Sequence, residues 1–104
     1  MKVNVLGTEY TIVTDASMDK YPNLEGTDGY CDYSTKEIVI REKDEEDELG
    51  DFTAFINKVM RHEIIHAYFY ESGLYFDQTE MMVDWIAIQL PKMSKEFEKL
   101  EINQ

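Results

Sequence analysis

The chain has 104 residues, room for one domain with a modest core, so we predict a single domain over residues 1–104. A formal net charge of −12 repels phosphate backbones, which argues against direct nucleic-acid binding and favours a protein or peptide partner with basic groups. The single cysteine, Cys31, excludes an internal disulfide, and no apolar stretch reaches membrane-spanning length. We therefore expect a cytoplasmic protein without a membrane segment; its oligomeric state is left open.

The first forty residues predict a small antiparallel sheet. Apolar and polar residues alternate on either side of Gly7, which predicts a hairpin over residues 3–12. Turn-forming residues fill 18–29 and predict a loop. Residues 30–33 and 37–41 flank a short polar turn and predict a second hairpin.

A long helix is predicted in the middle of the chain. Seven carboxylates crowd residues 42–51, which favours a solvated linker or a first helical turn. Apolar residues then recur at helical spacing: Phe52, Phe55, Ile56, Val59, Met60 and Ala67. Asp51 is the predicted N-cap, and the helix should reach about Glu71, where Ser72-Gly73 supplies the C-terminal cap.

Two further helices are predicted after a short aromatic loop at residues 74–78. The first is largely buried and ends near Pro91, although this proline can instead mark a kink. The second is an amphipathic C-terminal helix, because Met93, Phe97 and Leu100 are spaced by four and three. The fold class is therefore α+β, with a small antiparallel sheet packed on three helices.

An HExxH motif, His62-Glu63-Ile64-Ile65-His66, falls inside the long helix. Residues four apart lie on one helix face, so both imidazoles can reach one zinc ion. Glu63 lies one step around the helix, near enough to hydrogen-bond a water held by the metal and act as general base. The alternative is a helix without metal, in which His62 and Glu63 face solvent.

The third zinc ligand has to be a carboxylate or Cys31, since the chain contains no other histidine. Glu80 and Asp84 lie four apart on the next predicted helix and share a face. One can bind the metal while the other accepts the second N–H of a ligand histidine. In a competing interpretation, Glu80 closes a capping box that begins at Asp77.

HExxH followed by ExxxD on the next helix resembles the gluzincin pattern, and the short connection is similar to the ImmA/IrrE-type metallopeptidases common in phages and mobile elements. The motif covers residues 62–84. The resemblance implies a minimal zincin-like fold in which Glu80 is the third zinc ligand and Asp84 supports His62. It also implies an edge strand beside the helix that holds an extended peptide, and Ile38–Ile40 is our candidate for it.

The expected function is zinc-dependent peptide-bond hydrolysis with a narrow target range, in which Glu63 removes a proton from water. The resemblance also implies an oxyanion-stabilising histidine and tyrosine, and this chain has no histidine left for that role. Tyr70 and Tyr75 are candidate phenol donors. The alternatives are a non-catalytic, zinc-containing acidic protein that engages a basic or nucleic-acid-binding partner, and an acidic interaction module without metal.

Overall fold

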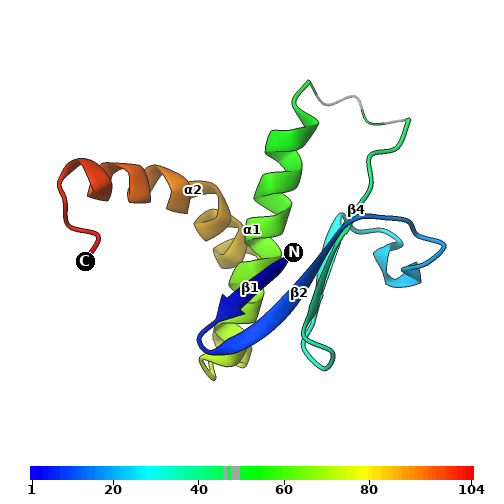
Figure 1. The fold of residues 1–104 in the computed structure, drawn as a ribbon, viewed down its shortest axis with the longest axis horizontal. Coiled ribbons are helices and arrows are strands. Elements are labelled where there is room, and N and C mark those ends of the chain that lie inside the picture. The colour runs from blue at the N-terminus through cyan, green and yellow to red at the C-terminus, as the bar shows by residue number, and fades with distance from the viewer. Residues whose placement is uncertain (46, 48–49) are drawn as a thin grey trace.

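The computed structural model describes residues 1–45, 47 and 50–104 and has an α+β fold (Figure 1). Its elements in chain order are β1 (Lys2–Val5), β2 (Thr8–Ala16), the 3₁₀ helix η1 (Pro22–Leu24), β3 (Gly29–Asp32), β4 (Glu37–Arg41), α1 (Phe52–Glu71), the 3₁₀ helix η2 (Tyr75–Asp77) and α2 (Glu80–Lys99). No helix among these residues combines the length and apolar character needed to cross a membrane.

Both predicted hairpins are confirmed, but the sheet is mixed and not antiparallel. The strand order is β1-β2-β4-β3, and β2 pairs with β4 in parallel. The reason lies in the run Ile38–Ile40, whose three side chains are all fully buried. A strand covered on both faces belongs inside a sheet. Our assignment of Ile38–Ile40 to the edge strand is therefore wrong, because β3 forms that edge.

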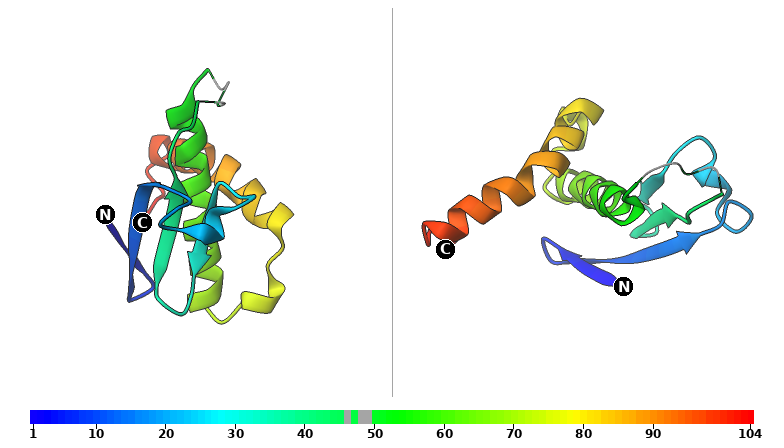
Figure 2. Two further views of the ribbon diagram at one scale, coloured as in Figure 1. Left: turned by 90° about the vertical axis from the view of Figure 1, so that its right-hand side faces the viewer. Right: turned by 90° about the horizontal axis from the view of Figure 1, so that it is seen from above.

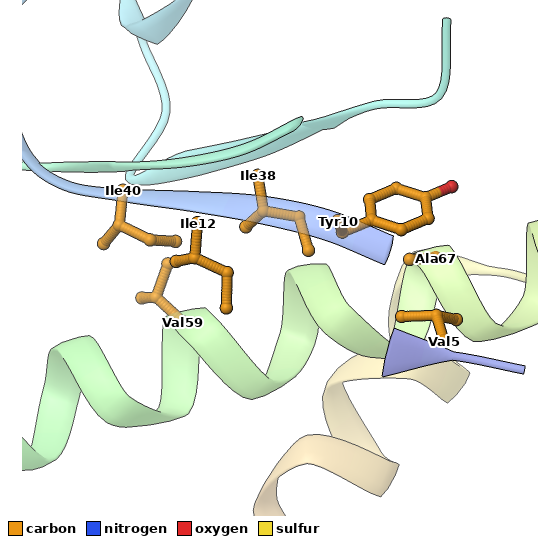
Figure 3. Close-up of a cluster of buried hydrophobic side chains, with 7 residues drawn as sticks. All are labelled: Val5, Tyr10, Ile12, Ile38, Ile40, Val59 and Ala67. Atoms are coloured by element: carbon orange, nitrogen blue, oxygen red, sulfur yellow. The ribbon is translucent and has the colours of Figure 1, made fainter. Parts of the chain in front are cut away.

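Each face of β4 has its own apolar cluster. Ile38 and Ile40 point toward α1 and pack with Val59 (Figure 3). Val39 points the other way and packs with Leu24 of η1. The predicted loop at residues 18–29 thus contains a short 3₁₀ helix that covers the second face of the sheet.

The predicted extent of α1 is confirmed. The Asp51 side chain accepts a hydrogen bond from the Ala54 amide, and Gly73 takes the left-handed conformation just past the helix end, with φ at +80°. The last residue, Glu71, is bonded to the sheet: its carboxylate accepts hydrogen bonds from Tyr10 Oη at 2.7 Å and Lys36 Nζ at 2.9 Å. Those bonds lower the pKa of Glu71 and fasten the end of α1 to β2 and the β3–β4 turn.

The acidic run at residues 42–51 includes positions 46, 48 and 49, so that part of the prediction lies outside the described residues. Within the described part, Asp47 is held in place. Both of its carboxylate oxygens accept hydrogen bonds at 2.9 Å from the Arg41 guanidinium. This bidentate pair lowers the pKa of Asp47 to about 2. At Asp47 the linker is therefore anchored to β4 and not solvated.

The two helices predicted after α1 are one continuous helix, α2, which runs through Pro91. Proline lacks an amide hydrogen, so the carbonyl of Ala87, four residues earlier, loses its usual helical partner. The Arg61 side chain on α1 fills this role, because its Nε donates to the Ala87 carbonyl oxygen at 2.8 Å. A bond from another helix thus allows α2 to continue where its own sequence predicts an end.

The helices are arranged with α1 between the sheet and α2 (Figure 2). The first half of α2 packs on α1 through Ile65, Val83 and Ala87. The outer half extends away from both α1 and the sheet (Figures 1 and 2).

We predict that Arg61 and Pro91 are energetically coupled. Arg61→Met removes the donor and leaves the buried Ala87 carbonyl unpaired, so it should lower the free energy of unfolding by about 1.5–3 kcal/mol. In a Pro91→Ala background the same substitution should cost about 1 kcal/mol or less, because residue 91 then donates its own amide to Ala87. Urea unfolding of the four proteins measures the coupling, with the exposed Lys95→Met as control. An equal cost in both backgrounds would contradict it.

Candidate metal centre

His62 and His66 lie one turn apart on α1 and turn their rings toward each other. The two Nε2 atoms are 3.1 Å apart, and the ring planes meet at 67°. Both residues lie on the part of α1 that packs against α2, so the neighbouring helix limits the orientations open to the rings. The predicted convergence of the two imidazoles is thus present in the structure.

Glu80 reaches the same point from the first residue of α2. One carboxylate oxygen lies 2.9 Å from His62 Nε2, and the other lies 2.8 Å from His66 Nε2. Thr79 is the N-cap, with its hydroxyl accepting from the Met82 amide. The interpretation of Glu80 as the end of a capping box from Asp77 is therefore wrong, and its carboxylate is available to the histidines.

The other ring nitrogens are held by two acceptors. His62 Nδ1 lies 3.2 Å from Asp84 Oδ1, and His66 Nδ1 lies 2.6 Å from Gln78 Oε1. A carboxylate and an amide oxygen can only accept, so each Nδ1 must donate its hydrogen. In a neutral imidazole with this hydrogen on Nδ1, Nε2 carries a lone pair. Both Nε2 atoms face Glu80 oxygens, which also only accept, so these contacts are favourable only with a cation between them or a second proton on each ring.

The donor atoms of this set lie close enough together to hold one metal ion. Bonds of about 2 Å in a tetrahedral arrangement place neighbouring donor atoms about 3.3 Å apart. The atoms that His62, His66 and Glu80 offer lie within 4.8 Å of one another, with the contacting pairs at 2.8–3.1 Å. Among the residues that the structure describes, this is the only such group of histidine, cysteine and acidic side chains, and Cys31 is not in it.

Asp84 also contacts a lysine. Lys58 Nζ lies 3.2 Å from the same Asp84 oxygen that faces His62. The hydrogen bond from Lys58 lowers the pKa of the Asp84 carboxyl, with a smaller contribution from His62. Asp84 thus stays ionised and orients the His62 ring.

Glu63 is buried, with 9% of its surface exposed, so the interpretation in which it faces solvent is wrong. Burial raises the pKa of its carboxyl to about 7; His66 opposes this rise and Glu80 adds to it. The side chain lines a hollow of about 350 Å³ that His66, Glu80 and the edge strand β3 also line. Glu63 thus combines a carboxylate that is largely shielded from solvent with access to the space beside the proposed ligands.

Cys31 lines the same hollow from the middle of β3. Burial raises the pKa of its thiol to about 12, and the nearby Glu63 carboxylate adds to the rise. A thiol that keeps its proton at neutral pH is a poor nucleophile. Cys31 also lies outside the converging donor group.

Tyr33 lines the space beside the proposed ligands, although no pattern in the sequence predicts it. It lines one hollow with Glu63 and a second with His66, Glu80 and Tyr75. Burial raises the pKa of its phenol to about 12, so the hydroxyl keeps its hydrogen. Its ring stacks on Tyr70 with centroids 4.5 Å apart, and Tyr70 lines a different hollow that holds none of the proposed ligands. Of the two predicted phenols, Tyr75 is therefore the one beside the site.

No protein-family model, no curated protein and no solved structure matches the chain. The resemblance to gluzincins and to ImmA/IrrE-type metallopeptidases therefore stays a prediction that rests on residues 62–84.

We predict that the purified chain binds one zinc ion and that Glu80→Ala weakens this binding more than Asp84→Ala. Losing a ligand removes a bond to the metal, whereas losing the acceptor of a histidine N–H only misorients the ring, at a cost of about 10–100-fold in affinity. Titration against a competing chelator ranks the variants, with exposed Glu98→Ala as control. The reverse order would make Asp84 the ligand, and a chain that binds no zinc would reject the centre.

Proposed function

We propose that this chain is a zinc-dependent metallopeptidase that hydrolyses peptide bonds, with His62, His66 and Glu80 as metal ligands. The observation that carries the proposal is the convergence of the His62 and His66 Nε2 atoms on the Glu80 carboxylate, while the Nδ1 atom of each ring faces another acceptor. Bound zinc supplies a Lewis acid that polarises the scissile carbonyl and acidifies a water molecule.

Glu63 is the general base in this proposal. Its carboxylate takes a proton from the attacking water and then gives that proton to the leaving amine. The buried position beside His66 and Glu80 supports this role, because it places the Glu63 carboxylate in the hollow next to the proposed ligands. The resemblance implies a side chain that donates a hydrogen bond to the oxyanion. In this proposal the phenol of Tyr33 or Tyr75 is that donor, since both side chains line a hollow with His66 and Glu80.

The substrate in this proposal is a peptide in extended conformation that pairs with β3. Among the described strands, β3 pairs only with β4, so its outer edge can accept a further strand. Gly29 keeps that edge close to α1: a Cβ atom there would lie 2.9 Å from the Val39 carbonyl oxygen and 3.1 Å from Val59 Cγ1. Because Gly29 has no side chain, β3 can pack directly against α1, the helix that carries Glu63.

A non-catalytic, zinc-containing acidic binding protein is the second candidate. The observation in its favour is that both histidines of the sequence belong to the proposed ligand pair, so none remains to stabilise an oxyanion. In this case the acidic chain would engage a basic partner through its surface, and Glu63 would have no chemical role.

Glu63→Gln separates the two candidates. The substitution keeps the shape of the side chain and removes the base, so we expect zinc affinity and thermal stability to persist while cleavage falls by about 10²–10⁴-fold. Cleavage is measured on a proteome-derived peptide library by mass spectrometry, at equal zinc occupancy of the proteins compared.

Glu98→Gln is the matched control, since it makes the same charge change at an exposed position of α2 and should cleave like the wild type. Equal cleavage by the wild type and Glu63→Gln would reject the peptidase proposal but would not contradict the zinc centre. A zinc-loaded wild type that cleaves no peptide of the library would favour the binding protein.

A further inference from the structure

A second hollow lies beside the edge strand β3, and none of the proposed zinc ligands lines it. Its volume is about 480 Å³, which is within the usual range of ligand pockets. Four tyrosine side chains contribute to its wall: Tyr30 of β3, Tyr33 just after β3, Tyr70 of α1 and Tyr75 of η2. We call it the tyrosine hollow.

The tyrosine hollow continues the space beside the metal centre. The hollow of about 350 Å³ next to the proposed ligands shares Tyr30, Cys31 and Tyr33 with it. A peptide paired with the outer edge of β3 would therefore reach both spaces. Because a strand advances about 3.3 Å per residue, the tyrosine hollow lies within about four residues of a peptide bond held at the metal.

The tyrosine rings hold one another in place. Tyr33 stacks on Tyr70 with ring centroids 4.5 Å apart, and the Tyr75 ring stands nearly perpendicular to both, with centroids at 5.3 and 5.8 Å. Both arrangements are favourable for aromatic pairs. Tyr70 is still 39% exposed and Tyr75 41% exposed, so a ligand can contact these rings without first rearranging them.

One carboxylate, Asp32, also lines the tyrosine hollow. Its Oδ1 atom accepts hydrogen bonds from the Ser34 amide at 3.0 Å and from the Ser34 hydroxyl at 2.6 Å. These bonds lower the pKa of Asp32, so its side chain is fixed in position and charged at neutral pH. Among the residues that the structure describes, Asp32 forms no ion pair.

One cation of the chain lies close to the four rings. Lys36 Nζ is 4.7 Å from the centroid of the Tyr70 ring. The charge of Lys36 is already compensated, because Nζ also lies 2.9 Å from a carboxylate oxygen of Glu71. Of the described residues that line the tyrosine hollow itself, none is lysine, arginine or histidine.

The carboxylates outweigh this lysine inside the tyrosine hollow. The Cys31 thiol, which lines the hollow, shows the balance of charges there. Burial is the main cause that raises its pKa; the Glu63 and Asp32 carboxylates raise the pKa further, and Lys36 lowers it by less than either. The tyrosine hollow thus combines aromatic rings with a negative potential, which favours a cationic side chain.

We propose that the tyrosine hollow is a subsite for an arginine side chain of the peptide substrate. A guanidinium group is planar, stacks on aromatic rings and forms paired hydrogen bonds with a carboxylate, so it matches both the tyrosines and Asp32. The net charge of −12 also favours a basic peptide. The role in the substrate rests on the proposed peptidase function, whereas arginine binding itself requires neither zinc nor cleavage.

Binding is tested with N-acetyl-arginine methylamide, titrated into the intact chain and followed through the tyrosine ring signals by NMR. The matched probe is N-acetyl-citrulline methylamide, which has nearly the same shape without the charge. We expect the arginine amide to bind at least about fivefold more tightly. Its addition should shift the ring signals of Tyr33 and Tyr75 and leave those of Tyr68, which is exposed on α1 outside the hollow.

Two pairs of variants locate the binding site. Asp32→Asn should weaken binding of the arginine amide at least about threefold, whereas Glu98→Gln removes an exposed charge on α2 and should leave binding unchanged. Tyr75→Leu should also weaken binding, because it removes an aromatic ring from the wall. Tyr75→Phe keeps that ring and should bind like the wild type.

The cleavage profile tests the role of the tyrosine hollow in the peptidase. Among library peptides that the wild type cleaves, arginine should be enriched at one fixed position within about four residues of the cleaved bond. For these peptides Asp32→Asn should raise KM at least about threefold and leave kcat unchanged, because a contact remote from the reacting atoms binds the substrate and the transition state equally.

Equal binding of the arginine and citrulline amides would reject the selectivity for charge, and tighter binding of N-acetyl-phenylalanine methylamide would make an aromatic side chain the occupant. Cleavage without a preferred arginine position would overturn the inference and leave the peptidase proposal intact. Selective arginine binding by a zinc-loaded chain that cleaves no peptide would reject the peptidase proposal and confirm the arginine site alone.

Discussion

Burial of α1 between the sheet and α2 is the constraint on which the other features depend. Val59 faces the sheet cluster and Ile65 faces α2, so two sides of the helix are fixed by packing. The sector between these sides carries His62, Glu63 and His66 and opens between β3 and the start of α2. A helix packed on only one side would leave the imidazoles free to rotate away from each other.

The local parts of the fold follow from the sequence because their signals are local. Asp51 and Gly73 bound α1, and positive φ at Leu6 and Gly7 closes the first hairpin. The parallel pairing of β2 with β4 joins segments that no short pattern relates, so the mixed sheet could not be predicted. The continuity of α2 was missed for the same reason, because the partner of the Ala87 carbonyl is Arg61 on another helix.

The candidate site was likewise predictable only where its residues are close together in the sequence. Spacing alone places His62 beside His66 and Glu80 with Asp84 on the facing helix. The burial of Glu63 depends on how closely β3 approaches α1, which a sequence motif does not encode. Gln78 and Tyr33 were missed because they come from the loop before α2 and the end of β3. Their place beside His66 exists only once these segments meet.

The bond between Arg61 and the Ala87 carbonyl also restricts the order in which this sequence can change. A proline at position 91 leaves a carbonyl unpaired in the interior unless an arginine already stands at position 61. Arginine without the proline costs little, since its guanidinium can turn toward water. Introducing the arginine before the proline therefore avoids an unpaired carbonyl, whereas the reverse order passes through a destabilised sequence.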